Sequence, residues 1–144
     1  MAKCNEIEYS IVTTPPSVYE KAKAMFGIDF ERTVFAYSPN IHVKSGKLRP
    51  DLIVHETTHF KQQEAVGGPE KWWDIYFVDA QQRFEWELEA YRIQWQFIKA
   101  NYKIGQQQQL MNDIGRFLVK MYNLPITEKE ARRLVHNPEL STPK

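Results

Sequence analysis

Residues 55–59 read His55-Glu56-Thr57-Thr58-His59, and the interpretation of this 144-residue chain depends on them. On an α-helix the two histidines lie about one turn apart, so their imidazoles project from one face. Glu56 is adjacent and brings a carboxylate to the same side. The spacing therefore predicts a helix that presents two nitrogen donors and one acid together.

The flanks of this stretch carry the signals of a helix start and a helix stop. Pro50 suits the first helical turn, and Asp51 complements the positive end of the helix. Apolar residues follow at 52–54, just ahead of the histidines. Gly67-Gly68-Pro69 is typical of a helix end. We therefore predict a helix over about residues 50–66.

One face of this helix is predicted to carry all of its polar chemistry. With about 100° between successive residues, the side chains that fall within about 60° of Leu52 are those of His55, Glu56, His59, Gln63 and Val66. Thr57 and Lys61 are predicted to point away. Gln62 and Gln63 are candidates to hydrogen-bond a substrate or the ligands of a metal, with exposure to solvent as the default for Gln62.

The order His-Glu-x-x-His is the pattern of zinc-dependent hydrolases. His55 and His59 can share one Zn²⁺, and Glu56 can polarise a water molecule for attack. The alternative is a helix with two histidines that bind no metal. Catalytic zinc takes three protein ligands, so a third donor must lie elsewhere. The metzincin extension is excluded, because Gln62 and Ala65 stand where it needs glycine and histidine.

A second amphipathic segment offers acids for the third position. Its apolar stripe comprises Phe84, Leu88, Tyr91, Trp95, Ile98 and Tyr102. Glu87 projects at about −60° from Phe84 and borders the stripe, whereas Glu85 and Glu89 project at about 100° and 140°. Because an acid at a core margin needs a compensating partner, we select Glu87 as the third metal ligand. The alternative is a surface ion pair, for instance with Arg83 or Arg92.

These residues resemble the gluzincin class of zinc metallopeptidases, in which His-Glu-x-x-His is followed by a glutamate ligand on a second helix. Glu87 follows His59 by 28 residues, and residues 87–90 are similar to the second motif of several gluzincin families. More narrowly, residues 55–63 and 87–91 resemble small minigluzincin-like proteins of bacteria and phages, over roughly residues 33–92. Tyr91 stands where some gluzincins have an aspartate that orients a zinc-binding histidine.

The resemblance implies a peptide or protein substrate, zinc held by His55, His59 and Glu87, and Glu56 as the catalytic acid–base group. It implies a minimal zincin-like domain of the α+β class, predominantly helical, with a β-hairpin beside the zinc helix. A strand just before that helix is expected to pair with extended substrate, and a simple packing hairpin is the alternative. A catalytically inactive structural or interaction protein, associated with phages, is the competing function.

A residue that stabilises the tetrahedral intermediate stays open among the candidates Tyr76, Tyr91, Tyr122 and His136. The first three are phenols, which can donate one hydrogen bond. For His136 the simpler interpretation is a helix-end residue favoured by the helix dipole. His42, on a predicted edge strand, is a weaker candidate to approach the metal or the substrate.

Length and composition predict one domain over residues 1–144, with an extended N-terminal arm over about 1–14. A formal net charge of +1 does not favour a nucleic-acid partner. Cys4 is the only cysteine, which excludes a disulfide framework. We find no secretory signal pattern and no apolar segment of membrane length, so we expect a cytoplasmic protein with no membrane partner. The oligomeric state stays open.

The remaining elements are predicted from periodicity and turn residues. A strand at 33–37, a turn at 38–40 and a strand at 41–44 form the only β region that we predict. Helices are expected over 17–26, 70–78, 80–101, 106–122 and 127–136. Trp72 and Trp73 are predicted to be core residues, with a pocket wall as the alternative.

Overall fold

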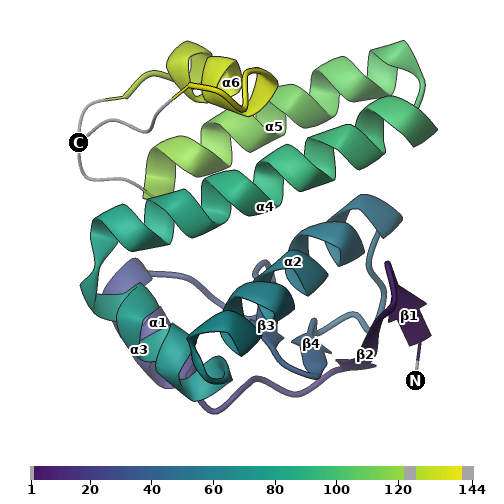
Figure 1. Cartoon of the computed structure of the whole chain (residues 1–144). Coiled ribbons are helices and arrows are strands. Elements are labelled where there is room, and N and C mark those ends of the chain that lie inside the picture. The colour runs from purple at the N-terminus through teal and green to yellow at the C-terminus, as the bar shows by residue number, and fades with distance from the viewer. Residues whose placement is uncertain (1, 122–125, 141–144) are drawn as a thin grey trace. The chain divides into compact units, whose positions relative to one another are not determined.

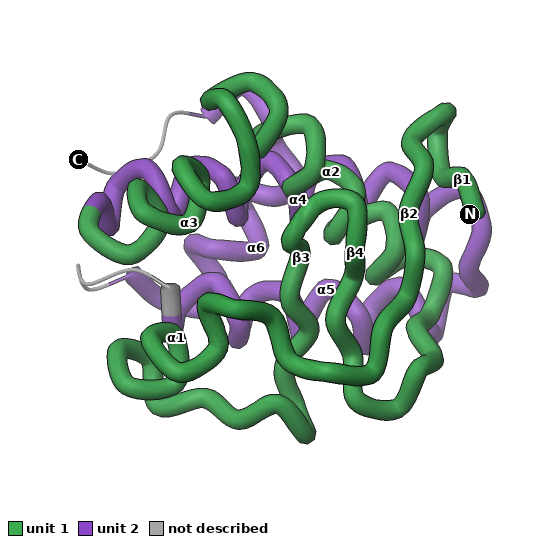
Figure 2. The backbone as a smooth tube through the Cα atoms, turned by 90° about the horizontal axis from the view of Figure 1, so that it is seen from below, with its two compact units in different colours: residues 1–78 green, residues 79–144 purple. Residues whose placement is uncertain are grey.

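The computed structural model describes residues 2–121 and 126–140, and it divides into two compact units, residues 1–78 and 79–144 (Figure 2). Across the described residues there are six α-helices and four β-strands, which confirms the predicted α+β class. The prediction of a single domain stays a prediction. No helix in the described part of the chain is both long enough and apolar enough to cross a membrane.

The first unit contains a four-stranded sheet with the order β1-β2-β4-β3 (Figure 1). Its strands are β1 (Ala2–Cys4), β2 (Ile7–Val12), β3 (Phe35–Tyr37) and β4 (Asn40–His42). The antiparallel hairpin of β3 and β4 confirms the predicted strand, turn and strand, although both strands are shorter than expected. The predicted β region is therefore only half of the sheet.

The other half of the sheet comes from the segment that was expected to be an extended arm. It is extended, but β1 pairs antiparallel with β2, and β2 pairs in parallel with β4. The register places Ile11 opposite Ile41. This pairing puts β4 inside the sheet, with β2 on one side and β3 on the other.

Helix α2 (Pro50–Val66) carries the His-Glu-x-x-His stretch and has the predicted start and stop. Gly67 follows it with a φ of 104°, a left-handed conformation that glycine adopts without steric cost. Asp51 is fully buried, and its carboxylate accepts hydrogen bonds from Arg49 Nε and a second guanidinium nitrogen at 3.0 and 3.2 Å. Asp51 is therefore a buried acid in a hydrogen-bonded ion pair with a half-exposed arginine, as well as a first-turn acid.

Aromatic side chains fill much of the first unit. The ring of Phe26 on helix α1 (Tyr19–Phe26) lies 5.9 Å from that of Tyr76 and 6.0 Å from that of Phe77, both on helix α3 (Pro69–Val78). Trp72 and Trp73 of α3 are buried, with their rings edge to face at 5.0 Å. This confirms the prediction that both tryptophans are core residues.

The second unit consists of three helices, α4 (Ala80–Asn101), α5 (Ile104–Met121) and α6 (Glu128–His136). The predicted stripe of α4 is confirmed: Phe84, Leu88, Trp95 and Ile98 are buried in one apolar cluster, and Tyr91 and Tyr102 pack against it. Helix α5 starts two residues before the predicted position 106, and residue 122 lies outside the described residues.

Helices α5 and α6 approach each other closely at Gly115. A Cβ atom added there would lie 2.8 Å from the Cγ of Arg132 and 3.1 Å from the carbonyl oxygen of Glu128. Only glycine leaves room for this approach without a shift of the neighbouring helix. Thr127 begins α6 by accepting a hydrogen bond from the backbone N–H of Glu130.

Candidate metal centre

His55 and His59 form a close pair within the first unit. Their Nε2 atoms lie 3.2 Å apart, and the ring centroids lie 4.8 Å apart with planes at 82°. Both imidazoles are buried, at 5% and 4% exposure. The spacing on α2 therefore brings the two histidines together as predicted, with one nitrogen of each ring directed at the other.

Gln62 contacts the second histidine of this pair. Its side-chain Oε1 lies 2.8 Å from His59 Nδ1, and the Gln62 side chain is buried at 6% exposure. The default expectation that Gln62 faces solvent is therefore wrong. The two residues are three positions apart on one helix, a spacing at which side chains meet on the helix surface. The ring of Trp72 lies 5.1 Å from that of His59.

Helix α2 is buried on more than one face around the histidines. Every residue from Val54 to Phe60 is buried, including Glu56. Thr57 and Lys61 were both predicted to point away from the polar face; Thr57 is 2% exposed and Lys61 is exposed. The Thr57 hydroxyl donates to the carbonyl of Ile53 at 2.8 Å. Because that bond is made within the helix, Thr57 can be buried without a polar partner elsewhere.

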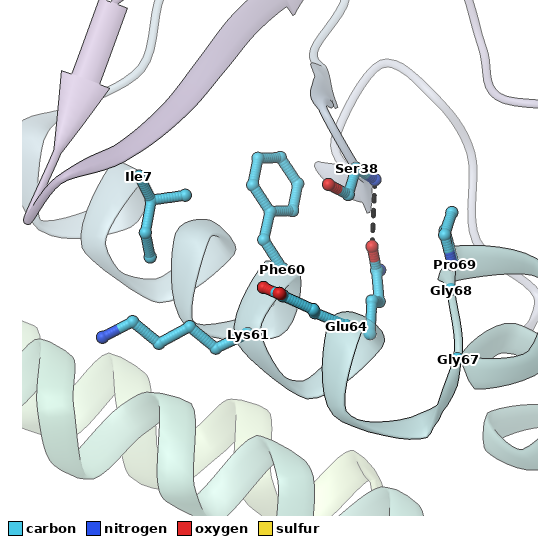
Figure 3. A pocket seen from close by; sticks show the side chains of 9 residues that line it. Ile7, Ser38, Phe60, Lys61, Glu64, Gly67, Gly68 and Pro69 are labelled. Atoms are coloured by element: carbon cyan, nitrogen blue, oxygen red, sulfur yellow. Dashed lines mark hydrogen bonds between the residues drawn. The ribbon is translucent and has the colours of Figure 1, made fainter.

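Gln63, the other candidate glutamine, contacts the edge of the sheet and not the histidines. Its Oε1 accepts a hydrogen bond from the backbone N–H of Ser38 at 2.9 Å (Figure 3). Its Nε2 donates to the carbonyl of Ala36 at 2.8 Å. Trp73 Nε1 donates to the same carbonyl at 2.9 Å. Side chains of α2 and α3 thus occupy this edge of β3.

This arrangement corrects the expected role of the strand before the zinc helix. That strand is β4, and it is paired on both sides, with β2 and with β3. A strand whose two edges are paired has no free backbone groups to offer an extended peptide. His42 therefore lies on an inner strand rather than an edge strand, where its Nδ1 is 2.7 Å from the carbonyl oxygen of Thr14.

A pocket of about 400 Å³ lies at the carboxyl end of α2 (Figure 3). Its walls come from β2, the turn between β3 and β4, and the junction of α2 and α3, and they include Ile7, Phe60, Lys61 and Glu64. His55, Glu56 and His59 do not line it. This pocket is therefore separate from the histidine pair.

The acids of α4 in the second unit differ in burial as the helical phase predicted. Glu87 is buried at 9% exposure, whereas Glu89 is exposed. Glu85 is partly buried, and its carboxylate accepts a hydrogen bond from Gln81 at 3.2 Å. The burial sets Glu87 apart from its two neighbours.

Arg92, one of the two arginines considered as an ion-pair partner for Glu87, forms hydrogen bonds with backbone carbonyls instead. Its guanidinium donates to the backbone carbonyls of Leu134, Asn137 and Leu140, at and beyond the carboxyl end of α6. Burial lowers the pKa of Arg92, although an arginine remains charged at neutral pH. Arg83 is buried on the same helix.

The candidates for stabilising a tetrahedral intermediate lie in different surroundings. Tyr76 is buried and stacks on Trp72 with ring centroids 4.8 Å apart. Tyr91 packs against the apolar cluster of the second unit. His136 ends α6 as predicted, and its ring meets that of Trp95 at 5.1 Å. Tyr122 lies outside the described residues.

Comparison with known proteins gives no assignment: no protein-family model matches the chain, and neither a curated protein nor a solved structure is significantly similar to it.

Proposed function

We propose that this chain is a zinc-dependent metallopeptidase, in which His55, His59 and Glu87 hold Zn²⁺ and Glu56 is the acid–base group. The observation that carries the proposal is the 3.2 Å separation of the two histidine Nε2 atoms. Two nitrogens bound to one tetrahedral zinc, each at about 2.0–2.1 Å, lie roughly 3.3 Å apart. The pair therefore has the separation that a shared metal ion requires.

The chemistry of the donor set also suits zinc. Two imidazoles and one carboxylate are the ligands of one class of catalytic zinc site, which keeps a fourth position for water. His55, His59 and Glu87 are each buried, and each offers a donor atom of a type that zinc prefers. Burial of Glu87 supports its selection, because a buried carboxylate needs a positive partner and a metal ion is one.

Zinc bound to these residues would supply a Lewis acid that polarises both a water molecule and the scissile carbonyl. Glu56 would accept one proton from the attacking water as its oxygen forms a bond to the carbonyl carbon. The same carboxyl group would then return that proton to the amine as the carbon–nitrogen bond breaks. In this proposal the fold is a minimal zincin-like one, with α2 as the zinc helix and α4 as the helix that carries the glutamate ligand.

The first test of the proposal is the metal content of protein purified without chelator. We expect close to one zinc per chain by elemental analysis. His59→Ala should abolish tight retention and Glu87→Ala should weaken it strongly, because each variant removes one ligand. Equal metal content in the wild type and in both variants would contradict the ligand assignment.

The second test separates catalysis from metal binding. Glu56→Gln keeps the size of the side chain but removes the proton acceptor, so the zinc content should be unchanged while hydrolysis falls by roughly 10² or more. The assay incubates both proteins with a cell-derived peptide mixture and identifies new termini by mass spectrometry. Equal cleavage by both proteins would exclude Glu56 as the base. Zinc binding without cleavage by either would favour the inactive structural protein.

A further inference from the structure

We propose that Gln62 is a positioning residue that fixes the tautomer of His59 and thereby directs the lone pair of His59 Nε2 towards His55. The proposal deepens the proposed function, because a metal would bind to that lone pair. The tautomer of His59 is also a property of the metal-free protein, so it can be measured even if no metal binds.

The chemistry of the two contacting atoms determines where the proton lies. The side-chain oxygen of Gln62 can only accept a hydrogen bond, so at 2.8 Å the proton between it and His59 belongs to Nδ1 of the histidine. A neutral imidazole carries one proton on its two nitrogens. In neutral His59 the Nε2 atom therefore has no proton and presents its lone pair.

The position of the proton on His55 follows from its contact with His59. The two Nε2 atoms are 3.2 Å apart, which is within hydrogen-bonding distance. Since His59 Nε2 is the acceptor, the proton between the rings belongs to His55 Nε2. In the metal-free protein one proton thus occupies the position between the two nitrogens, and a bound metal ion would replace it.

The surroundings of Gln62 suit a fixed orientation. Its side chain is buried, so water competes little for His59 Nδ1. Its position three residues after His59 on the same helix fixes the approach of the amide to the ring. Histidine ligands commonly donate their second N–H to a carboxylate or a carbonyl, and such partners set both the tautomer and the orientation of the ring. Gln62 supplies a neutral oxygen for this role.

The decisive measurement is the tautomer of His59 in metal-free protein, read from long-range ¹H–¹⁵N NMR spectra of the imidazole nitrogens. We expect a protonated Nδ1 and a bare Nε2 in the wild type. Gln62→Leu should lose this preference, while Lys61→Leu at the adjacent exposed position should keep it. Gln62→Glu retains an acceptor oxygen and should keep it as well. A wild-type His59 that is protonated on Nε2 would overturn the proposal.

The second measurement is zinc affinity by competition with a chelator, in variants whose fold is checked by circular dichroism. Loss of such a partner typically weakens metal binding about 10- to 100-fold, and we expect a loss of this size in Gln62→Leu but not in Lys61→Leu or Gln62→Glu. If folded Gln62→Leu keeps both the wild-type tautomer and the wild-type affinity, Gln62 has no positioning role. If neither the wild type nor any variant binds zinc while the tautomers are as expected, the proposed function fails and the role of Gln62 stands.

Discussion

The side-chain oxygen of Gln63 accepts a hydrogen bond from the backbone N–H of Ser38 over 2.9 Å. With the second bond from Gln63 Nε2 to the carbonyl of Ala36, one side-chain amide engages a backbone group of β3 and another just after its end, as a neighbouring strand would. Gln63 is fully buried. A glutamine of helix α2 thus closes the sheet edge where an added strand would otherwise bind.

Replacement of Gln63 should therefore destabilise the first unit. In Gln63→Leu the Ser38 N–H loses its acceptor, while the Ala36 carbonyl keeps its bond from Trp73. Ser38 is only part-buried, and a hydrogen bond of this kind contributes about 0.5–1.5 kcal/mol, so we expect a loss of stability of this size in urea denaturation. The exposed neighbour Glu64→Leu should change stability by less than about 0.5 kcal/mol. Equal effects at both positions would contradict the role assigned to Gln63.

The three acids of α4 should differ in their effect on zinc binding. Glu87→Gln should weaken binding strongly, whereas Glu85→Gln and Glu89→Gln should be nearly silent, because Glu87 is the buried member of the three. Chelator competition measures all three variants on one scale. A strong loss in Glu85→Gln or Glu89→Gln would show that the helical phase was assigned wrongly.

Replacement of two glycines of α5 by alanine should change the stability of the protein in opposite directions. Alanine generally favours a helix over glycine by up to about 1 kcal/mol. At Gly105 nothing lies within 4 Å of an added Cβ, so Gly105→Ala should raise the melting temperature. At Gly115 the contacts of 2.8 Å to Arg132 and 3.1 Å to Glu128 make the site overpacked, and Gly115→Ala should cost about 1–2 kcal/mol. A gain in stability at Gly115 would contradict the close helix approach.

The turn between β1 and β2 offers a stabilising substitution. Asn5 and Glu6 have φ angles of 48° and 66°, and a non-glycine residue in this left-handed region costs about 1–2 kcal/mol. Glu6→Gly would create the Asn-Gly pair preferred in such hairpins. We expect it to raise the free energy of unfolding by about 0.5–1 kcal/mol. Glu8→Gly, within β2, is the matched control and should lower it.

The same turn explains why the sequence did not reveal half of the sheet. Local rules look for Asn-Gly between two alternating segments, and here the second turn residue is Glu6. Residues 7–11 do alternate between apolar and polar side chains, which was the available signal. The parallel pairing of β2 with β4 joins residues about 30 positions apart, and no local pattern specifies such a partner.

The helices were predictable for the opposite reason. Pro50 and Gly67 mark the ends of α2 locally, and the apolar stripe of α4 repeats with the helical period. The burial of Thr57 and Gln62 was not predictable from one helical face, because elements distant in sequence decide how many faces of a helix are covered. The pairing of Gln62 with His59 follows from their spacing, but the choice among its possible partners required coordinates.

The continuous burial of α2 from Val54 to Phe60 has a consequence for the evolution of this chain. Residues that would perform the chemistry are also residues on which folding depends, so most substitutions there would be removed by selection even in a lineage that had lost catalysis. Survival of the His-Glu-x-x-His stretch among descendants would then reflect the demands of folding as much as those of an enzyme. Glu56 is the most informative position, because Glu56→Gln is nearly isosteric and drift to glutamine there would mark the loss of the proposed activity.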